Sequence, residues 1–166
     1  MAGKKTNLSD HKKFNFTPDA KTSIGIVVSE WNTEVTGALC QGAVDSLVEY
    51  GIKPKAIDIR YVPGSFELPL GAFLMLQAKK YDAIICLGCI IQGETRHFEF
   101  IAQAVAKGIM DLGLGWITPV IFGVLTTDTF EQAKARAGGK HGNKGVEAAV
   151  SALKMIQLTK DVKGKK

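Results

Sequence analysis

The sequence predicts an α/β domain built on a four-stranded parallel sheet with helices on both faces. Short β-rich apolar runs alternate four times with longer segments whose apolar residues recur at helical spacing. The apolar run 83–91 is continuous, as expected of a strand that is buried on both faces. No repeat and no Gly/Ser/Pro linker divides residues 22–159, so we expect a single domain there.

Each predicted element has its own sequence signal. β-branched runs bounded by turn residues predict the strands, and apolar residues three or four apart predict the helices. Thr33 is a candidate N-cap of the first helix, and Gly51 and Gly113 follow the predicted ends of the first and third helices. Pro69 falls near the start of the second helix, where its missing N–H is tolerated. In chain order, the prediction is strand 23–28, helix 33–50, strand 55–62, helix 66–78, strand 82–89, helix 97–112, strand 119–125, helix 128–135, a Gly-rich turn 137–142 and helix 143–159.

The positive charge is concentrated at the two ends of the chain. The formal net charge is +5, but residues 1–21 and 160–166 carry +3 each, which leaves −1 for residues 22–159. This distribution favours solvated lysine-rich ends over a nucleic-acid-binding face, with an anionic partner as the minor alternative. We expect an extended N-terminal arm at 1–21, either flexible or packed on a neighbouring subunit, and a lysine-rich tail at 160–166.

The composition indicates a cytoplasmic protein without a membrane partner. The apolar run 83–91 is far shorter than the roughly 20 residues needed to cross a bilayer, and the first residues lack the apolar core of a secretory signal. Three cysteines, in a chain large enough to fold without disulfides, fit a reducing compartment. Cys86 and Cys89 have the spacing of a C-x-x-C motif, but they end a predicted buried strand, which argues against a zinc or thioredoxin-like site.

Candidate functional residues follow the first two predicted strands. Ligands of open parallel sheets bind at the carboxyl ends of the strands. Trp31 and Asn32 follow the first strand, where the indole could stack on a planar ligand, although packing at the sheet edge is the commoner role. Ser65, Phe66 and Glu67 follow a Pro-Gly turn after the second strand. Glu67 could complement the helix dipole or accept hydrogen bonds from ligand hydroxyl groups.

The segment after the third strand combines an anion-binding turn with a histidine. Gly93 allows close backbone approach, and Thr95 adds a hydroxyl group. The helix that begins near His97 presents free N–H groups that suit an anion such as phosphate. His97 at this position is a candidate for proton transfer. The Glu94 carboxylate must point away from any phosphate bound here.

A basic, glycine-rich segment follows the fourth strand. Residues 136–145 place Arg136 and Lys140 among glycines, as is typical of an anion-binding loop. Neither a Walker A motif nor a Gly-x-Gly-x-x-Gly after a strand is present, so the sequence does not support a nucleotide site. Arg136 is therefore a candidate for bidentate recognition of an anionic group.

Taken together and in order, these segments resemble the 6,7-dimethyl-8-ribityllumazine synthases of the riboflavin pathway. The matching segments, which cover nearly all of residues 23–158, are SEWN, VPGSFELP, GCIIQGETRHFEF, PVIFGVLTTDTFEQAKARAG and GNKGVEAAVSAL. The resemblance implies a flavodoxin-like three-layer sandwich. It also implies a transferase that condenses 5-amino-6-(D-ribitylamino)uracil with 3,4-dihydroxy-2-butanone 4-phosphate and releases phosphate and water. Enzymes of this kind use no metal and no organic cofactor.

The resemblance also implies a role for individual residues. His97 would transfer protons, and Arg136 would bind the phosphate. Trp31 would stack on the pyrimidine ring. The other implied contacts are Glu94 and Thr95 through their backbone N–H groups at the phosphate, Asn32 at nearby polar groups, Ser65, Phe66 and Glu67 along the ribityl chain, Ile90 and Ile91 at the ring pocket, and Phe122 and Lys140 from a neighbouring subunit.

This sequence departs from the family's common residues at a few positions, and the resemblance also implies an oligomeric state. Glu30 and Gln92 stand where Arg is common, and Trp31 stands where Phe is more frequent. The resemblance implies a homopentamer or an icosahedral capsid of 60 subunits, which the short turn at 138–142 permits, and riboflavin synthase as a candidate partner. The alternatives are a non-catalytic protein that binds ribityl or phosphate ligands and a shell-forming protein of the same fold.

Overall fold

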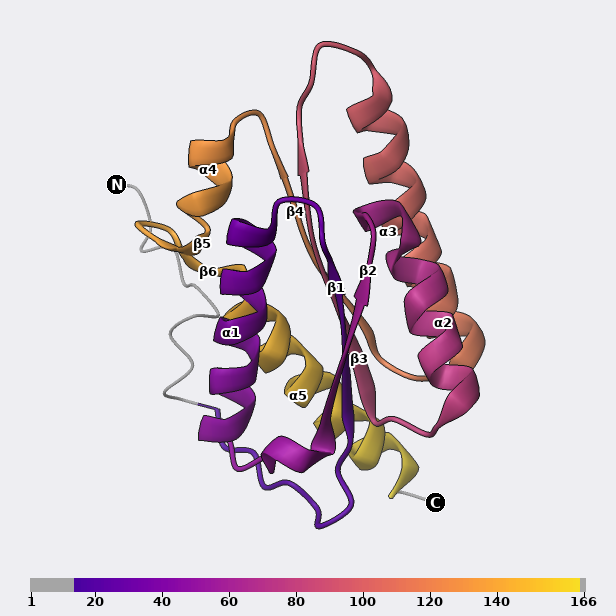
Figure 1. Ribbon diagram of the computed structural model, residues 1–166. Coiled ribbons are helices and arrows are strands. Elements are labelled where there is room, and N and C mark those ends of the chain that lie inside the picture. Colours follow the sequence, from indigo (N-terminus) through magenta and orange to yellow (C-terminus); the bar gives the residue numbers. More distant parts are fainter. Residues whose placement is uncertain (1–13, 165–166) are drawn as a thin grey trace, which may run out of the picture.

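The computed structural model, which describes residues 14–164, is a three-layer α/β sandwich (Figure 1). Its central sheet has the strand order β2-β1-β3-β4, and every pairing is parallel. This arrangement confirms the predicted flavodoxin-like fold. The strands are β1 Ile24–Ser29, β2 Ile57–Val62, β3 Ala83–Ile91 and β4 Val120–Thr127.

Helices cover both faces of the sheet, as Figure 1 shows. Helices α1 Thr33–Glu49 and α5 Lys144–Lys163 pack on one face and contact each other extensively. Helices α2 Leu68–Ala78 and α3 His97–Trp116 pack on the other face. Right-handed crossovers between parallel strands require helices on both faces when the chain extends the sheet in both directions from its first strand.

An apolar core fills the space on each side of the sheet. Alternate residues of β1 point to opposite cores: Ile26 joins Leu39 and Leu153 on the α1/α5 side, whereas Val27 joins Leu68 and Ile109 on the α2/α3 side. Strand β3 is buried from Ala83 to Ile90, which confirms the prediction made from its continuous apolar run.

The register of the strands produces a step at the carboxyl edge of the sheet. Strand β1 pairs with β3 only as far as Val28–Leu87, whereas β3 and β4 remain paired as far as Ile91–Thr127. The last residues of β3 therefore extend beyond β1. The loop that follows β1 lies beside this projecting end of β3.

Helix α1 begins at residue 33, as predicted, but the predicted N-cap of this helix and the predicted end of the third helix are wrong because of backbone conformation. The N-cap of α1 is Asn32, and Thr33 is the first helical residue, with its Oγ1 donating to the Glu30 carbonyl (2.6 Å). Helix α3 continues past Gly113 to Trp116. It ends at Ile117, which has a left-handed backbone (φ 50°, ψ 36°) and donates its N–H to the Gly113 carbonyl. The glycine therefore lies inside the last turn instead of following it.

Short elements refine the other predicted boundaries. A 3₁₀ turn, η1 Pro54–Ala56, precedes β2, and a second, η2 Ser65–Glu67, precedes α2. The short helix is α4 Phe130–Lys134. The predicted Gly-rich turn contains a small hairpin of β5 Ala137–Gly139 and β6 Gly142–Asn143.

The described ends of the chain lie against its own helices. Phe14 and Phe16 pack against the α1/α5 core, and Asp19 forms an ion pair with Lys160 (2.6 Å). Helix α5 includes the first four residues of the segment predicted as a tail. The rest of the predicted arm, 1–13, and residues 165–166 lie outside the described residues. In the described part of the chain, no helix is both long and apolar enough to span a membrane.

Candidate active site

A cavity of about 680 Å³ opens at the carboxyl edge of the sheet, beside the step between β1 and β3. Open parallel sheets bind ligands at this edge. The cavity brings together eight of the residues that the sequence singled out, from four separate segments. Its lining residues are Trp31, Asn32, Gly64, Ser65, Phe66, Glu67, Cys89, Ile90, Ile91, His97 and Ile101.

The Trp31 side chain is presented to solvent and to this cavity. It is 73% exposed, so the more common packing role at a sheet edge does not apply here. The Trp31 N–H donates to the Pro63 carbonyl (3.1 Å), and the preceding Glu30 N–H donates to the Val62 carbonyl (2.8 Å). The loop after β1 is thereby tied to the end of β2, and its indole has an open face on which a planar ring could stack.

Asn32 lines the cavity and also ties the loop after β1 to strand β3. Its backbone is left-handed (φ 61°, ψ 45°), and its side chain makes no cap bond to the helix that it begins. Instead, its Nδ2 donates to the Cys89 carbonyl on β3 (3.0 Å). No local sequence pattern indicated this contact, because the two residues are far apart along the chain.

The turn η2 supplies polar groups to the floor of the cavity. The Ser65 side chain is buried, and its Oγ has no hydrogen-bond partner among the described residues. This Oγ lies against strand β3, 2.6 Å from the point where a Cβ on Gly88 would stand, so it is enclosed by protein atoms. The Glu67 Oε2 accepts the N–H of Gly64 (3.0 Å), so this carboxylate closes the turn as well as facing the cavity.

His97 is the first residue of α3 and lines the same cavity as Trp31. Its backbone N–H lies 3.4 Å from the Thr95 Oγ1, which accepts a hydrogen bond from it. The loop of Glu94 and Thr95 is exposed and leads directly into the helix N-terminus. The positive end of the helix dipole therefore points toward this loop, as expected for an anion site.

Arg136 and Phe122 line a second cavity of about 390 Å³ between β4 and α5, together with Thr126. The Arg136 Nη1 donates to the Gln132 carbonyl (3.0 Å), which holds the guanidinium group beside helix α4. The two cavities share no lining residue. The predicted site residues therefore fall into two separate groups within one chain.

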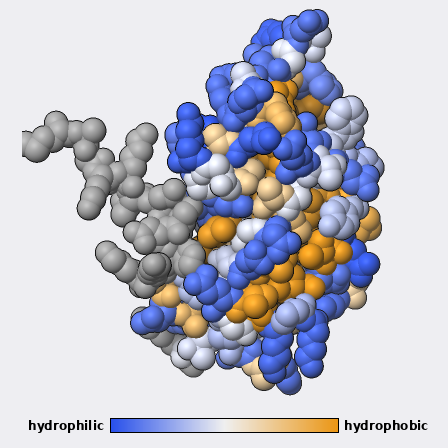
Figure 2. All heavy atoms as spheres, turned by 60° about the vertical axis from the view of Figure 1, so that its left-hand side comes forward, coloured by the Kyte–Doolittle hydropathy of each residue, from blue (hydrophilic) through white to orange (hydrophobic). Residues whose placement is uncertain are grey.

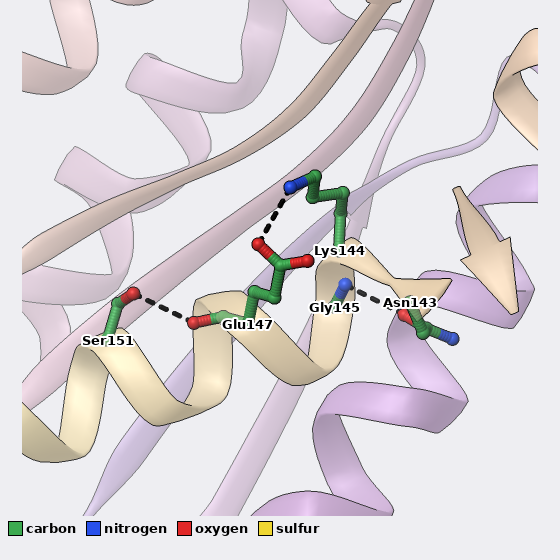
Figure 3. A network of polar contacts seen from close by, with 5 residues as sticks. All are labelled: Asn143, Lys144, Gly145, Glu147 and Ser151. Atoms are coloured by element: carbon green, nitrogen blue, oxygen red, sulfur yellow. Dashed lines mark hydrogen bonds and ion pairs between the residues drawn. The ribbon is translucent and has the colours of Figure 1, made fainter. Parts of the chain in front are cut away.

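An ion pair in the second cavity was missed by the sequence analysis. The Lys144 Nζ lies 2.7 Å from the Glu147 Oε2, and the side chain of Glu147 is only 14% exposed (Figure 3). Figure 3 also shows how α5 begins: the Asn143 Oδ1 accepts the N–H of Gly145 (2.8 Å). The i, i+3 spacing of the charges was the available signal, but such pairs are common on helix surfaces.

Three predicted site residues line neither cavity in the described part of the chain. Glu94 and Thr95 lie in the exposed loop before α3, and Lys140 lies exposed at the turn between β5 and β6. Glu94 and Thr95 precede the cavity residue His97 in the sequence, and Lys140 follows the cavity residue Arg136. Their roles in the site stay predictions.

Cys89, which lines the first cavity, has an unreactive thiol. Burial raises the pKa of the Cys89 thiol to about 11 and that of Cys86 to about 12, so both stay protonated at neutral pH and are poor nucleophiles. Within residues 14–164, no group of three or more His, Cys, Asp or Glu side chains is placed to hold a metal ion.

Comparison with known proteins gives a consistent result over most of the chain. The model of the family described as 6,7-dimethyl-8-ribityllumazine synthase matches residues 21–160. Similar proteins with that name include one from Cytophaga hutchinsonii, 62% identical over 81% of this chain and 85% of the relative. Others come from Christiangramia forsetii (52% identical, 98% of both chains) and Parabacteroides distasonis (48% identical, 96% of this chain and 99% of the relative). The chain belongs to the 6,7-dimethyl-8-ribityllumazine synthase family.

Proposed function

We propose that this protein catalyses the penultimate step of riboflavin biosynthesis, the formation of 6,7-dimethyl-8-ribityllumazine. The substrates are 5-amino-6-(D-ribitylamino)uracil and 3,4-dihydroxy-2-butanone 4-phosphate, and the reaction releases inorganic phosphate and water. The observation that carries the proposal is the cavity that combines an exposed indole, a buried hydroxyl without a partner and the histidine at the start of α3. Family membership supports the same reaction.

The first cavity suits the pyrimidine substrate. Trp31 stacks on the flat ring, and Ile90 and Ile91 lie along its edge. Ser65 and Glu67 line the part of the site that takes the ribityl chain, and the Glu67 carboxylate accepts hydrogen bonds from its hydroxyl groups. Phe66 covers the chain from the solvent side, where its ring is exposed.

The chemistry requires positioning and proton transfer. One amine of the pyrimidine adds to the ketone and loses water to give an imine, phosphate then leaves, and the second amine closes the ring with loss of water. His97 transfers protons during these steps, since it stands between the ring cavity and the anion-binding loop. The backbone N–H groups of Glu94 and Thr95 bind the phosphate before it departs. Holding two reactive substrates together supplies much of the rate.

A neighbouring subunit completes the site with Phe122, Arg136 and Lys140. The support for this proposal is that Arg136 and Phe122 line a cavity separate from the one that holds His97. A head-to-tail contact that brings the second cavity of one copy to the first cavity of the next closes into a ring. We propose a homopentamer, alone or packed twelve to an icosahedral capsid.

The surface of the isolated chain is consistent with such an assembly. Large apolar side chains are exposed on helices α2 and α3, among them Leu70, Leu74, Met110 and Leu114. Figure 2, which brings the left-hand side of Figure 1 forward, shows that hydrophobic residues are also exposed on another face, among hydrophilic ones. Extended apolar surface of this kind marks protein interfaces more often than free surface.

The extent of the catalytic domain, the cellular compartment and a partner enzyme complete the proposed function. Residues 22–159 form the catalytic domain. The protein acts in the cytoplasm, as its free cysteines suggest, and riboflavin synthase is its candidate partner because that enzyme consumes the lumazine.

The proposal is tested by mixing the two substrates with the purified protein and following the fluorescence of the lumazine. Sedimentation of the same sample gives the oligomeric state. Turnover that falls about ten- to a thousandfold in the His97→Ala variant supports the proposed function. Tight binding of a ribityl ligand without turnover would identify a non-catalytic binding protein, and capsids without turnover would identify a shell protein.

A further inference from the structure

The turn that carries Trp31 has an unusual backbone conformation. An Asn at a helix N-cap normally has an extended backbone and accepts an N–H of the first turn with its Oδ1. Asn32 instead has φ 61° and ψ 45° and makes no side-chain cap bond. Within residues 14–164, the only other non-glycine residue with positive φ is Ile117. A left-handed residue outside glycine is a small source of strain that the surrounding structure must hold in place.

A hydrogen bond from the Asn32 side chain to strand β3 offsets the strain of this backbone conformation. The Asn32 Nδ2 donates to the Cys89 carbonyl at 3.0 Å. Strand β1 pairs with β3 only as far as Val28–Leu87, so Cys89 lies beyond the last backbone pairing of β1. The amide of Asn32 therefore takes the place of a strand partner and fixes the loop to the projecting end of β3.

Trp31 is held from the other side by the loop after β2. Its N–H donates to the Pro63 carbonyl (3.1 Å), and its Cδ1 lies 3.6 Å from the point where a Cβ on Gly64 would stand. Since the indole itself is largely exposed, few side-chain contacts restrain it. The position of the ring therefore depends mainly on the backbone of Asn32 and on that of the loop at Pro63 and Gly64.

We propose that Asn32 is a positioning residue, which holds the left-handed turn and thereby fixes the Trp31 indole over the cavity. One N–H of its side-chain amide is bound to the Cys89 carbonyl, and this tether would act on the substrate through Trp31. This differs from the direct polar contact with substrate that the resemblance implied. The proposal rests on the proposed function only where it concerns binding of the pyrimidine.

The test uses a Trp116→Phe background, in which Trp31 is the sole tryptophan of the chain. Asn32→Gly keeps the left-handed turn accessible but removes the tether, and Asn32→Asp places a carboxylate oxygen against the Cys89 carbonyl. In both variants we expect lower fluorescence anisotropy of Trp31 and faster quenching by acrylamide in the ligand-free protein. The dissociation constant for 5-amino-6-(D-ribitylamino)uracil should rise about five- to tenfold, as for one lost hydrogen bond, while kcat at saturation changes less.

Asn143 offers a matched control. It is also a helix N-cap whose Nδ2 donates to a distant carbonyl, that of Ala38 (2.9 Å), but it does not line the cavity of Trp31. Asn143→Asp in the same background should lower thermal stability and leave the anisotropy of Trp31 unchanged. Circular dichroism confirms that each variant is folded.

The possible outcomes separate the positioning role from its alternatives. Parental anisotropy and quenching in both Asn32 variants would overturn the proposal. Weaker binding with an unchanged Trp31 signal would show that Asn32 contacts the substrate directly, which also overturns it. If the parent protein does not bind the pyrimidine at all, the proposed function fails, while the ligand-free anisotropy still decides the positioning role.

Discussion

Co-assembly of two impaired variants would show whether the active site is shared between subunits. His97→Ala removes the proposed proton-transfer group from the first cavity, and Arg136→Ala removes the proposed phosphate-binding group from the second. We expect His97→Ala to slow turnover by about ten- to a thousandfold, because substrate positioning remains. We expect Arg136→Ala to be similarly impaired at substrate concentrations below saturation.

The size of the recovery follows from the geometry of a ring. Each site needs an intact His97 from one subunit and an intact Arg136 from the next. In rings assembled at random from equal amounts of the two variants, each condition is met half of the time. About one quarter of the sites are then complete, so the mixture should recover about 25% of the wild-type rate. This value is well above the residual activity of either variant.

The assay is the appearance of lumazine fluorescence after the two variants are dissociated together and reassembled. Variants that are assembled separately and then mixed should stay inactive. Co-assembly of His97→Ala with Trp31→Ala is the matched control, because both residues line the same cavity of one chain. This pair leaves no complete site. A rate equal to the mean of the separate variants after co-assembly of the first pair would refute the shared site.

Three further predictions concern single residues. Arg136→Ala should weaken binding of the butanone phosphate much more than binding of the pyrimidine, and Arg136→Lys should restore it only in part, as separate titrations would show; equal weakening of both ligands would contradict a phosphate-binding role. Ile117→Gly should raise the free energy of unfolding by about 1 kcal/mol in denaturant titrations, because a β-branched residue is strained at φ 50°; unchanged stability would show that the strain is offset elsewhere. Burial, together with the hydrogen bond to Asp58, raises the pKa of Tyr81 from 10.0 to about 12. The unfolded chain therefore loses this proton first as the pH rises, and the stability that Tyr81 contributes should be present below pH 10 and fall toward pH 12. Comparison with Tyr81→Phe across this range checks the sign, since the variant should lack this part of the fall.

Much of the fold could be predicted from local sequence patterns. The unbroken apolar run of β3 already required burial on both faces, and the alternation of strands and helices required a parallel sheet. Helix ends were less predictable, because they depend on backbone conformation. Thr33 is a good N-cap by residue type, yet the N-cap is the left-handed Asn32 and Thr33 is the first helical residue. Gly113 is a good C-terminal residue for a helix by type, yet helix α3 continues to Trp116 and is capped by Ile117.

The sequence alone determined which residues are candidates for the chemistry, because the segments after the strands are short and adjacent to elements with strong patterns. Trp31, Glu67 and His97 were found in this way, and the structure brings them to one cavity. Only the tertiary structure decided how these groups are arranged. The step in register between β1 and β3 exposes the carbonyl to which Asn32 is bound, and the packing of α5 against β4 sets Arg136 in a cavity apart from His97. Contacts between residues so distant along the chain depend on the register of strands and the docking of helices, and neither is encoded in a local pattern.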